Sequence, residues 1–290
     1  MTAIVEQQRD AAVGNRNMDE ARVWHTRIED MDRPLNRIFP VWLLEEALRL
    51  NKLTLVKPSL WSDPREDPCA MFVLQSQTDP KRPMQELAGY LAPSWAQCWS
   101  YEAESDVLLR AYSRVALDPI AKRNTEPANE GVRVTTTARK LIAAAERWTL
   151  HEPDHQFFLG QVIYEDEAVF GQSLANKLSH PDGPRVFGTP QGRADSLFIK
   201  RAMFRHEDEV RLLCVGTGRL HEGDNIRRFD IDPNALFDEV RFDPRLIAFE
   251  RREREDRVRA LGFTGKVVED PSYLQTLTSI PMPSGWPDPD

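Results

Sequence analysis

The chain has 290 residues, of which 41% are hydrophobic and 29% charged, and its formal net charge is −8. This balance is typical of a globular protein with a substantial core. We expect one large domain over residues 22–275, between a flexible N-terminal tail (1–21) and an extended C-terminal tail (276–290). The negative charge argues against a general nucleic-acid or anionic-membrane coat, because such binding depends on clustered lysines and arginines.

Cysteine usage and hydropathy predict where the protein is found. Cys69, Cys98 and Cys214 stand in dissimilar contexts without a C-x-x-C pair, and an odd number cannot all pair within one chain. We therefore interpret them as reduced thiols. No apolar run of about 18 residues is present, and the first residues lack the apolar centre of a signal peptide. The sequence predicts a cytoplasmic protein with no membrane contact.

The first half of the chain alternates helix, strand and turn signals. Apolar residues recur at helical spacing over 42–50, and "LTLV" at 53–56 changes to a strand pattern. In "SLWSDPREDP" (59–68), short polar side chains precede prolines, which favours turns. "SWAQCWS" (94–100) predicts a strand, and Ser105 can accept hydrogen bonds from the first free amides of a helix that follows it.

The part of the chain after residue 130 contains the clearest strands. "GVRVTT" (131–136) predicts a strand, and the threonines at 135–137 can cap an amphipathic helix after it. "FFLGQVIY" and "EVRLLCVG" are rich in branched and aromatic residues and too short for helices. Between them, residues 179–195 carry prolines and glycines without a helical period, which indicates a long, poorly packed loop or lid.

The last regular element expected is a charged helix near the C-terminus. Residues 245–263 alternate in charge and carry apolar residues that suggest one apolar stripe on a solvated helix; these residues are Leu246, Ile247, Phe249, Val258 and Leu261. Because strands occur in pairs interrupted by helices of irregular length, the pattern favours an α+β fold. We expect a mostly antiparallel or mixed central sheet with flanking helices.

A charged cluster stands at the start of the strand expected at 209–216. In an extended backbone alternate side chains share one face, so Glu207, Glu209 and Arg211 are predicted to project together. Arg211 can then hold Glu209 ionised and oriented, with Glu207 near enough to feel the like charge. Lys200 is a candidate anion contact. The alternative is a solvent-exposed ion pair at a sheet edge.

Three further residues are candidates for ligand contact. Ser100 and Tyr101 stand at the end of the strand expected at 94–100, where loops on a rigid scaffold often meet ligands. His25 stands in a short strand-like segment and can donate to a hydroxyl or phosphate. The alternative for each is a structural role, as a turn residue, a core aromatic residue or a satisfied histidine.

Several common chemistries lack their motifs. The six histidines contain no H-E-x-x-H, and Pro153 separates His151 from His155, so no metal site is predicted. There is also no G-x-x-x-x-G-K-[ST] loop, no G-x-G-x-x-G after a strand and no G-x-S-x-G elbow. The absence of these motifs argues against kinases, classical dinucleotide oxidoreductases and standard hydrolases.

An ordered set of short motifs resembles a bacterial family described as a domain of unknown function. Members show N-D-P-[FY]-E, C-F-S, [LM]-W-x-x-Y, G-[VI]-x-[IV], V-x-Y and K-x-x-x-W-x-x-E-x-E-x-R in that order. The matching stretches here are "LTLVKPSLWSDPREDP", "CWSYEAESDVLLRAYS", "GVRV", "GQVIY" and "LFIKRAMFRHEDEVRL". The matching residues carried over are Asp63, Pro64, Tyr112, Lys200, Glu207, Glu209 and Arg211. The departures are Ser62 for Asn, Arg65 for an aromatic residue, and Arg110 and Phe204 for Trp.

The order of residue types also resembles the layout of ADP-ribosyltransferases. Those enzymes have an Arg or His on an N-terminal strand, a mid-chain Ser or Tyr near an aromatic residue, and a late strand preceded by E-x-E. The resemblance implies NAD as substrate, Glu209 stabilising an oxocarbenium-like transition state and Glu207 orienting the acceptor. It implies substrate contacts by His25, Ser100, Tyr101, Tyr112, Lys200 and Arg211, and a setting in stress, toxin or anti-phage biology.

A second interpretation belongs to a different class. Lys200, Glu207, Glu209 and Arg211 can instead form an internal salt-bridge network in a non-catalytic binding or scaffold protein, where the network fixes a strand to its neighbours. The sequence alone leaves both interpretations open. It also leaves open whether an acceptor is a protein or a nucleic acid, and the oligomeric state.

Overall fold

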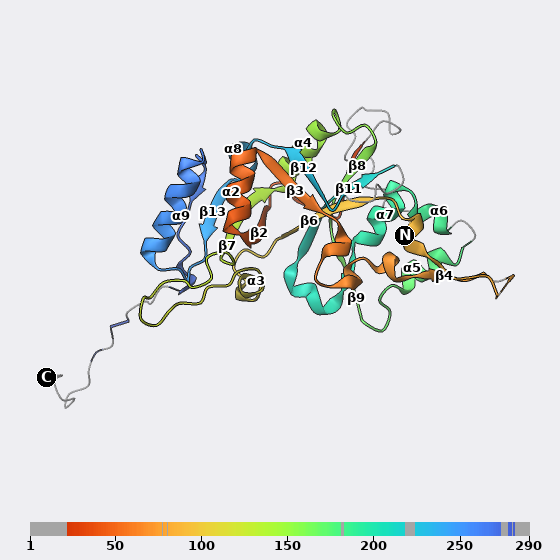
Figure 1. Ribbon diagram of the computed structural model, residues 1–290, viewed down its shortest axis with the longest axis horizontal. Coiled ribbons are helices and arrows are strands. Elements are labelled where there is room, and N and C mark those ends of the chain that lie inside the picture. The colour runs from red at the N-terminus through yellow and green to blue at the C-terminus, as the bar shows by residue number, and fades with distance from the viewer. Residues whose placement is uncertain are drawn as a thin grey trace.

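The structure is a computed structural model that describes residues 22–76, 78–79, 81–180, 183–217, 224–273, 278–279 and 281. The expected N-terminal tail lies outside the described residues, and so does most of the expected C-terminal tail. Figure 1 shows the strands in the middle of the molecule, with α2 and α9 toward one end and α5, α6 and α7 toward the other. None of the described helices has the length and apolarity needed to cross a lipid bilayer.

The described part of the chain contains many short strands. They are β1 (Val23–Thr26), β2 (Pro34–Pro40), β3 (Lys52–Val56), β4 (Val73–Leu74), β5 (Gln85–Glu86), β6 (Ser94–Ser100), β7 (Gly131–Thr137), β8 (His155–Gln161), β9 (Ile163–Glu165), β10 (Ile199–Arg201), β11 (Glu209–Gly216), β12 (Ile226–Asp230), β13 (Glu239–Phe242) and β14 (Lys266–Val267).

Helices separate these strands at irregular intervals. The α-helices are α2 (Val41–Leu50), α3 (Asp106–Tyr112), α4 (Ala138–Trp148), α5 (Gln172–Leu178), α6 (Gly183–Phe187), α7 (Pro190–Leu197), α8 (Pro233–Leu236) and α9 (Ala248–Ala260). The 3-10 helices are η2 (Pro58–Leu60), η3 (Pro64–Glu66), η4 (Pro68–Met71), η5 (Leu87–Tyr90), η6 (Ala202–Glu207) and η7 (Pro271–Tyr273).

The predicted α+β class with a mixed central sheet is confirmed. The main sheet runs in the order β1-β8-β11-β6-β2-β7-β13-β14, and β3 joins it through β6 and carries β12. The β1–β8 and β13–β14 pairs are parallel, whereas β11 is antiparallel to both β8 and β6. The strand with the charged cluster is therefore an interior strand of the sheet.

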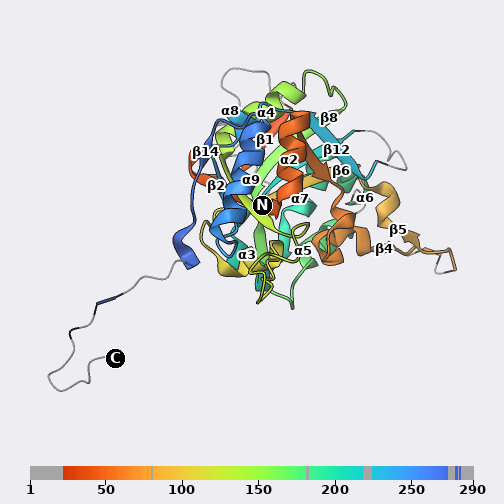
Figure 2. The same ribbon diagram turned by 60° about the vertical axis from the view of Figure 1, so that its left-hand side comes forward.

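The two faces of β11 pack against different helices. Val210, Leu212 and Cys214 belong to a core cluster that also contains the apolar faces of α2 and α4. Leu213 and Val215 instead pack in a cluster with residues of α7. Figure 2 shows α2 and α9 next to each other on the side that has come forward. Because side chains alternate along a strand, Arg211 is directed to the α7 face.

Beside β6 the sheet divides. Within the described residues, β2 pairs with β6 at Asn36–Ser100 alone, and β3 pairs with β6 at Val56–Ala96 alone. Between these two points the two neighbouring strands diverge from β6. The amide of Gln97 spans part of the fork by donating to the Thr54 carbonyl oxygen at 3.2 Å. A sheet that forks in this way leaves room for side chains and ligands next to an interior strand.

The helix caps predicted from the sequence are formed in the structure. The Ser105 hydroxyl accepts from the Leu108 amide at the start of α3, and Thr137 accepts from the Lys140 amide at the start of α4. Asp63 likewise accepts from the Arg65 amide and opens η3. These bonds satisfy amides that a helix cannot pair internally.

The expectation of a loose loop over 179–195 is wrong. The segment contains α6 and most of α7, and Thr189 caps α7 by accepting from the Gly192 amide while Pro190 occupies its first turn. Arg193 on α7 is buried and forms a bidentate pair with Asp67 at 2.5 and 2.6 Å. Because the residues buried on α7 include small and charged ones, the helix shows no apolar period in the sequence.

The charged helix predicted near the C-terminus is present as α9, and Leu246 and Val258 of the predicted apolar stripe are buried, but charged residues share the inner face. The buried positions within α9 are Glu250, Arg254 and Val258, and Phe249 is 57% exposed. Arg254 pairs with the buried Glu130 at 2.6 Å. Glu250 accepts from the Asn124 backbone amide, and both of these charged residues have partners outside α9, so hydropathy could not identify the whole inner face.

Candidate active site

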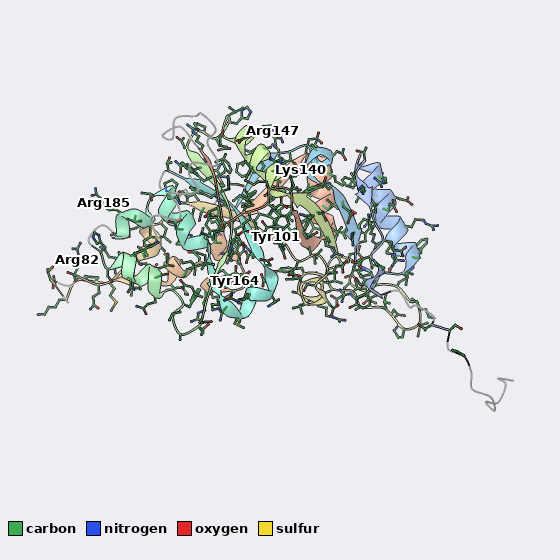
Figure 3. All side chains as sticks on the ribbon, turned by 180° about the vertical axis from the view of Figure 1, so that it is seen from behind. Arg82, Tyr101, Lys140, Arg147, Tyr164 and Arg185 are labelled. Carbon is green, nitrogen blue, oxygen red and sulfur yellow. The ribbon has the colours of Figure 1, made fainter. Side chains whose placement is uncertain are left out.

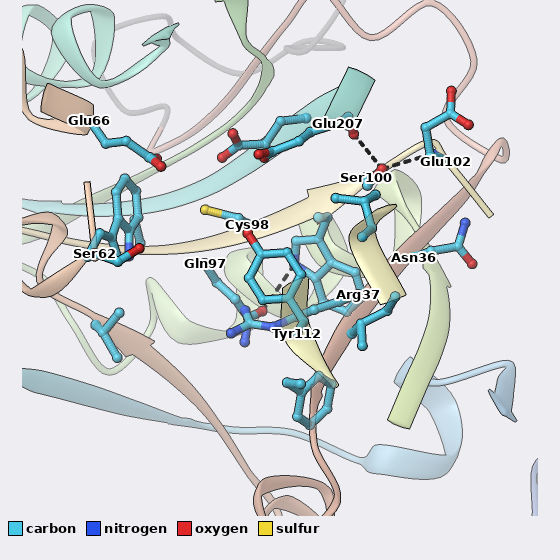
Figure 4. Close-up of a pocket in the computed structure, with 18 of the residues that line it drawn as sticks. Asn36, Arg37, Ser62, Glu66, Gln97, Cys98, Ser100, Glu102, Tyr112 and Glu207 are labelled. Carbon is cyan, nitrogen blue, oxygen red and sulfur yellow. Dashed lines mark hydrogen bonds between the residues drawn. The ribbon is translucent and has the colours of Figure 1, made fainter. Parts of the chain in front are cut away.

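A cavity of about 380 Å³ opens where β2 and β3 diverge from β6 (Figure 4). Its wall comes from five regions: 36–40 on β2 with the start of α2, 56–66 around η2 and η3, 96–102 along β6, Leu108 and Tyr112 on α3, and a charged group around the start of β11. This volume lies within the range of small-molecule sites, which is roughly 300–1,000 Å³.

Glu209 is held by two cations at the base of this cavity. Its Oε1 accepts from Arg211 Nε at 2.6 Å, and its Oε2 accepts from Lys200 Nζ at 2.8 Å. The backbone amide of Glu209 donates to the Tyr164 hydroxyl at 2.9 Å. Glu209 is 1% exposed and Arg211 is fully buried. The alternative of a solvent-exposed ion pair at a sheet edge is therefore wrong, because β11 has a neighbour on each side.

Lys200 joins three carboxylates into one network. Its Nζ lies 2.8 Å from Glu209, 2.7 Å from Glu207 and 3.3 Å from Glu66. Arg211 donates from Nη2 to Glu66 at 2.6 Å and from Nη1 to the Leu197 carbonyl oxygen at 2.6 Å. Three carboxylates against two cations leave one net negative charge beside the cavity.

Burial and charge set different ionisation for the members of this network. Burial opposes the charge on Glu209, but Arg211 and Lys200 outweigh it and lower the pKa of this carboxyl to about 2. Burial likewise opposes the charge on Lys200, yet the carboxylates raise its pKa above the usual range. For Glu66 burial prevails and raises the pKa, although Arg211 and Lys200 oppose it. At neutral pH Glu209 is an anion.

The backbone at Glu207 is not the extended strand that the sequence pattern predicts. Glu207 ends η6, and Asp208 follows with a left-handed backbone (φ 39°) before β11 begins. The predicted extended geometry is therefore wrong at Glu207, although its carboxylate still meets Lys200. Ser100 fixes this turn, since its hydroxyl donates to the Glu207 carbonyl oxygen at 2.5 Å. The backbone amide of Tyr101 donates to the Asp208 carbonyl oxygen, and the Tyr164 hydroxyl accepts from the Glu209 amide. Both tyrosines are labelled in Figure 3.

Aromatic rings cover the cations of the network. The Trp61 ring centroid lies 4.7 Å from Arg211 Cζ, and the Phe204 ring centroid lies 4.9 Å from Lys200 Nζ. Trp61 also lines the cavity. Cation–π contacts of this kind stabilise charges that have lost water. The rings therefore help to keep both cations in place beside Glu209.

Arg37, on β2, provides a cation of a different kind. Its side chain lines the cavity, and its Nη1 is buried without a hydrogen-bond partner. Within the part of the chain that the structure describes, no carboxylate forms an ion pair with it. Burial lowers the pKa of Arg37 to about 10, so the group stays charged at neutral pH. A partly buried charge with a desolvated donor and no counterion is unfavourable unless a ligand supplies one.

The residues predicted from the sequence occupy three kinds of position. Those that line the cavity are Ser100, Tyr112, Lys200, Glu207 and Glu209. Arg211 lies behind the wall and acts through Glu209 and Glu66. Tyr101 is buried outside the wall, with the Arg33 guanidinium 3.9 Å from its ring centroid. His25 belongs to β1, which β8 and β11 separate from β6, so it is not part of this cavity.

Sequence reasoning missed three charged residues of the cavity wall, which are Arg37, Glu66 and Glu102. Glu66 ends the "SDPRE" stretch, at the position of the glutamate that closes the N-D-P-[FY]-E motif, so a signal for it was present. Arg37 stands in "PLNRIFP" without any motif. Its unpaired state follows from the fork in the sheet, which no local pattern encodes.

Comparisons with known proteins give a weak structural likeness. No protein-family model matches the chain, and no curated protein matches it. Among solved structures, it is similar to Thermus sp. 2.9 DarT in complex with ADP-ribosylated ssDNA, at 13% identity and a TM-score of 0.36 over 84% of this chain and 97% of that one. The NAD+ complex of the same protein gives 12% identity and a TM-score of 0.34 over 84% and 98%. Scores of this size carry no argument about function.

Proposed function

We propose that this chain binds NAD⁺ in the cavity at the fork and transfers its ADP-ribose group with release of nicotinamide, as an ADP-ribosyltransferase does. The observation that carries the proposal is the pair of opposite electrostatic poles in one cavity. Arg37 offers an unpaired cation, and the network around Glu209 offers net negative charge. NAD⁺ has matching parts, a pyrophosphate anion and a cationic nicotinamide ring. Each pole therefore finds its complement in one ligand.

The Arg37 pole suits the pyrophosphate. A guanidinium presents donors in a fixed fork that matches phosphate oxygens, and Arg37 has donors that no described residue accepts. The ligand would supply the missing counterion. This accounts for a charge that is otherwise unfavourable where it lies.

The Glu209 pole suits the reacting ribose. When the bond between the nicotinamide nitrogen and the ribose carbon breaks, its electron pair leaves with nicotinamide and positive charge develops on the ribose. A carboxylate that is ionised, oriented by two cations and shielded from water stabilises such a charge without reorganising. Glu209 meets these conditions, since Arg211 and Lys200 hold both its oxygens.

The test is nicotinamide release from NAD⁺ by the wild-type protein and by Glu209→Gln, with and without cell extract as a source of acceptors. We expect the wild type to release nicotinamide and the variant to lose roughly 100- to 1,000-fold in rate, because an amide keeps the shape without the charge. Glu130→Gln is the matched control. Glu130 is a buried carboxylate paired with an arginine outside the cavity, so this variant should keep the wild-type rate per folded molecule.

A non-catalytic binding or scaffold protein is the second candidate. The observation in its favour is that Lys200, Glu209 and Arg211 satisfy one another, as a structural network does. On that reading the wild type releases no nicotinamide with any of several extracts, and Glu209→Gln mainly lowers the melting temperature. Those two results together would overturn the transferase proposal.

A further inference from the structure

Glu66 is fixed beside the cavity by a segment far from it in sequence. It ends η3, and two consecutive residues of β10 hold this turn: Arg201 pairs with Asp63 at 2.6 Å, and Lys200 lies 3.3 Å from Glu66. Arg211 adds a third bond, to Glu66 Oε2 at 2.6 Å. Three cations on two strands thus set the position of one short turn. Preorganisation of this kind is what a catalytic side chain requires.

The carboxylates of Glu66 and Glu209 differ in access. Both oxygens of Glu209 accept from cations within 2.8 Å, and its side chain is 2% exposed. Glu66 Oε2 is bound to Arg211, whereas Oε1 has a longer contact with Lys200 and the side chain is 15% exposed. Figure 4 shows the Glu66 carboxylate directed toward the carboxylates near Glu207. An oxygen of Glu66 is therefore the more accessible to a small molecule in the cavity.

We propose that Glu66 accepts the proton of the oxygen nucleophile, water or an acceptor hydroxyl, that attacks the ribose carbon; this rests on the function proposed above. The ribose–nicotinamide bond breaks with its electron pair going to nicotinamide. The nucleophile's oxygen forms the new bond to the ribose carbon, and its proton passes to Glu66 Oε1 and then to solvent. Glu209 stays ionised throughout.

The ionisation of the two carboxyls fits this division of roles. Burial raises the pKa of Glu66, which makes it the better proton acceptor, while Arg211 and Lys200 lower that of Glu209. Two carboxyls whose surroundings move their pKa values apart are suited to separate acid–base and electrostatic roles. The base form of Glu66 is lost as the pH falls through its raised pKa, so it should set an acidic limb in the pH–rate profile.

The experiment compares Glu66→Gln with wild type in the rate and pH profile of nicotinamide release and in NAD⁺ binding. In buffer alone the nucleophile is water, and added methanol supplies a hydroxyl nucleophile. Glu66→Gln should lower the rate by about 100-fold in both, change NAD⁺ affinity little and remove the acidic limb. Azide carries no proton to be accepted, so added azide should restore much of the rate.

Glu167→Gln is the matched control, because Glu167 pairs with Arg65 on the same turn but lies outside the cavity wall. It should behave as wild type and gain nothing from azide. If Glu66→Gln misfolds, Glu66→Asp should fold with a reduced rate and keep the acidic limb.

Three results would overturn the proposal. The first is turnover by Glu66→Gln at the wild-type rate, and the second is a loss that azide does not restore. The third is a Glu207→Gln variant that, in place of Glu66→Gln, loses the acidic limb of the pH–rate profile and recovers its rate with azide. All three leave the transferase function intact. Absence of turnover by the wild type overturns that function and the role of Glu66 with it.

Discussion

Two buried glutamate–arginine pairs with nearly the same geometry lie in different surroundings. Glu209 meets Arg211 at 2.6 Å beside the cavity, and Glu130 meets Arg254 at 2.6 Å between β7 and α9. All four residues are at most 5% exposed. Glu130 also accepts from the Asn124 amide at 3.1 Å and is not part of the cavity wall. Pair geometry therefore does not distinguish a structural ion pair from a functional one, whereas the adjoining space does.

The partners of the two pairs differ in a second respect. Around Glu209 the charges do not balance, because Lys200 gathers further carboxylates at the cavity and Arg37 lies in the wall without a counterion. Around Glu130 a second buried carboxylate, Glu250, accepts from the Asn124 backbone amide and leaves one oxygen without a partner, but neither glutamate lines the cavity. The imbalance at the cavity is what a charged ligand can relieve.

The largest expected effect is on the stability that the Glu130–Arg254 pair provides. Glu130→Gln should lower the free energy of unfolding by roughly 3 kcal/mol, because removing one partner leaves Arg254 buried without a full countercharge. Urea unfolding of both proteins at neutral pH measures this. A loss below about 0.5 kcal/mol would show that the pair near α9 is as dispensable as a surface ion pair.

The second prediction concerns acid stability. Since the folded-state pKa of Glu209 is about 2, below its ordinary value of 4.5, ionised Glu209 stabilises the fold above about pH 4.5. That contribution, on the order of 3 kcal/mol, is lost as the pH falls from 4.5 toward 2. The difference in unfolding free energy between wild type and Glu209→Gln should therefore shrink between pH 6 and pH 3. A constant difference would contradict the lowered pKa.

The third prediction addresses the unpaired cation. Arg37→Gln should weaken NAD⁺ binding by about 10- to 100-fold, which corresponds to roughly 1.4–2.7 kcal/mol. Without ligand, the same variant should melt at or above the wild-type temperature, because a partly buried charge without a counterion has been removed. Calorimetric titration and thermal melting measure the two effects. Arg139→Gln, which removes an exposed arginine paired with Asp32, is the control and should leave binding unchanged. A large drop in melting temperature for Arg37→Gln would assign Arg37 a structural role.

The smallest expected effect concerns α7, which the sequence pattern predicted to be part of a loop. Thr189→Ala removes the cap of α7 and should lower the free energy of unfolding by about 1 kcal/mol. Thr189→Ser, which keeps the hydroxyl, should recover most of that loss. Hydrogen exchange at α7 as fast in the wild type as in a flexible loop would favour the original loop expectation.

Local signals determined much of the fold. The strands at 94–100 and 209–216 and the caps at Ser105 and Thr137 follow from short-range chemistry, because branched residues favour strands and hydroxyls satisfy free amides. The inner faces of α7 and α9 could not be predicted in full, because Arg193 and Arg254 are buried there by partners distant in sequence. Hydropathy assigns such positions to the surface.

For the candidate site, the sequence determined which charged side chains meet at the start of β11, since Glu209 and Arg211 are two residues apart on one face of a strand. Tertiary structure alone decided that Glu66 joins them from η3, that His25 lies on β1 across two intervening strands, and that Arg37 has no counterion. The physical reason is that the divergence of β2 and β3 from β6 creates the cavity, and long-range strand pairing sets that divergence.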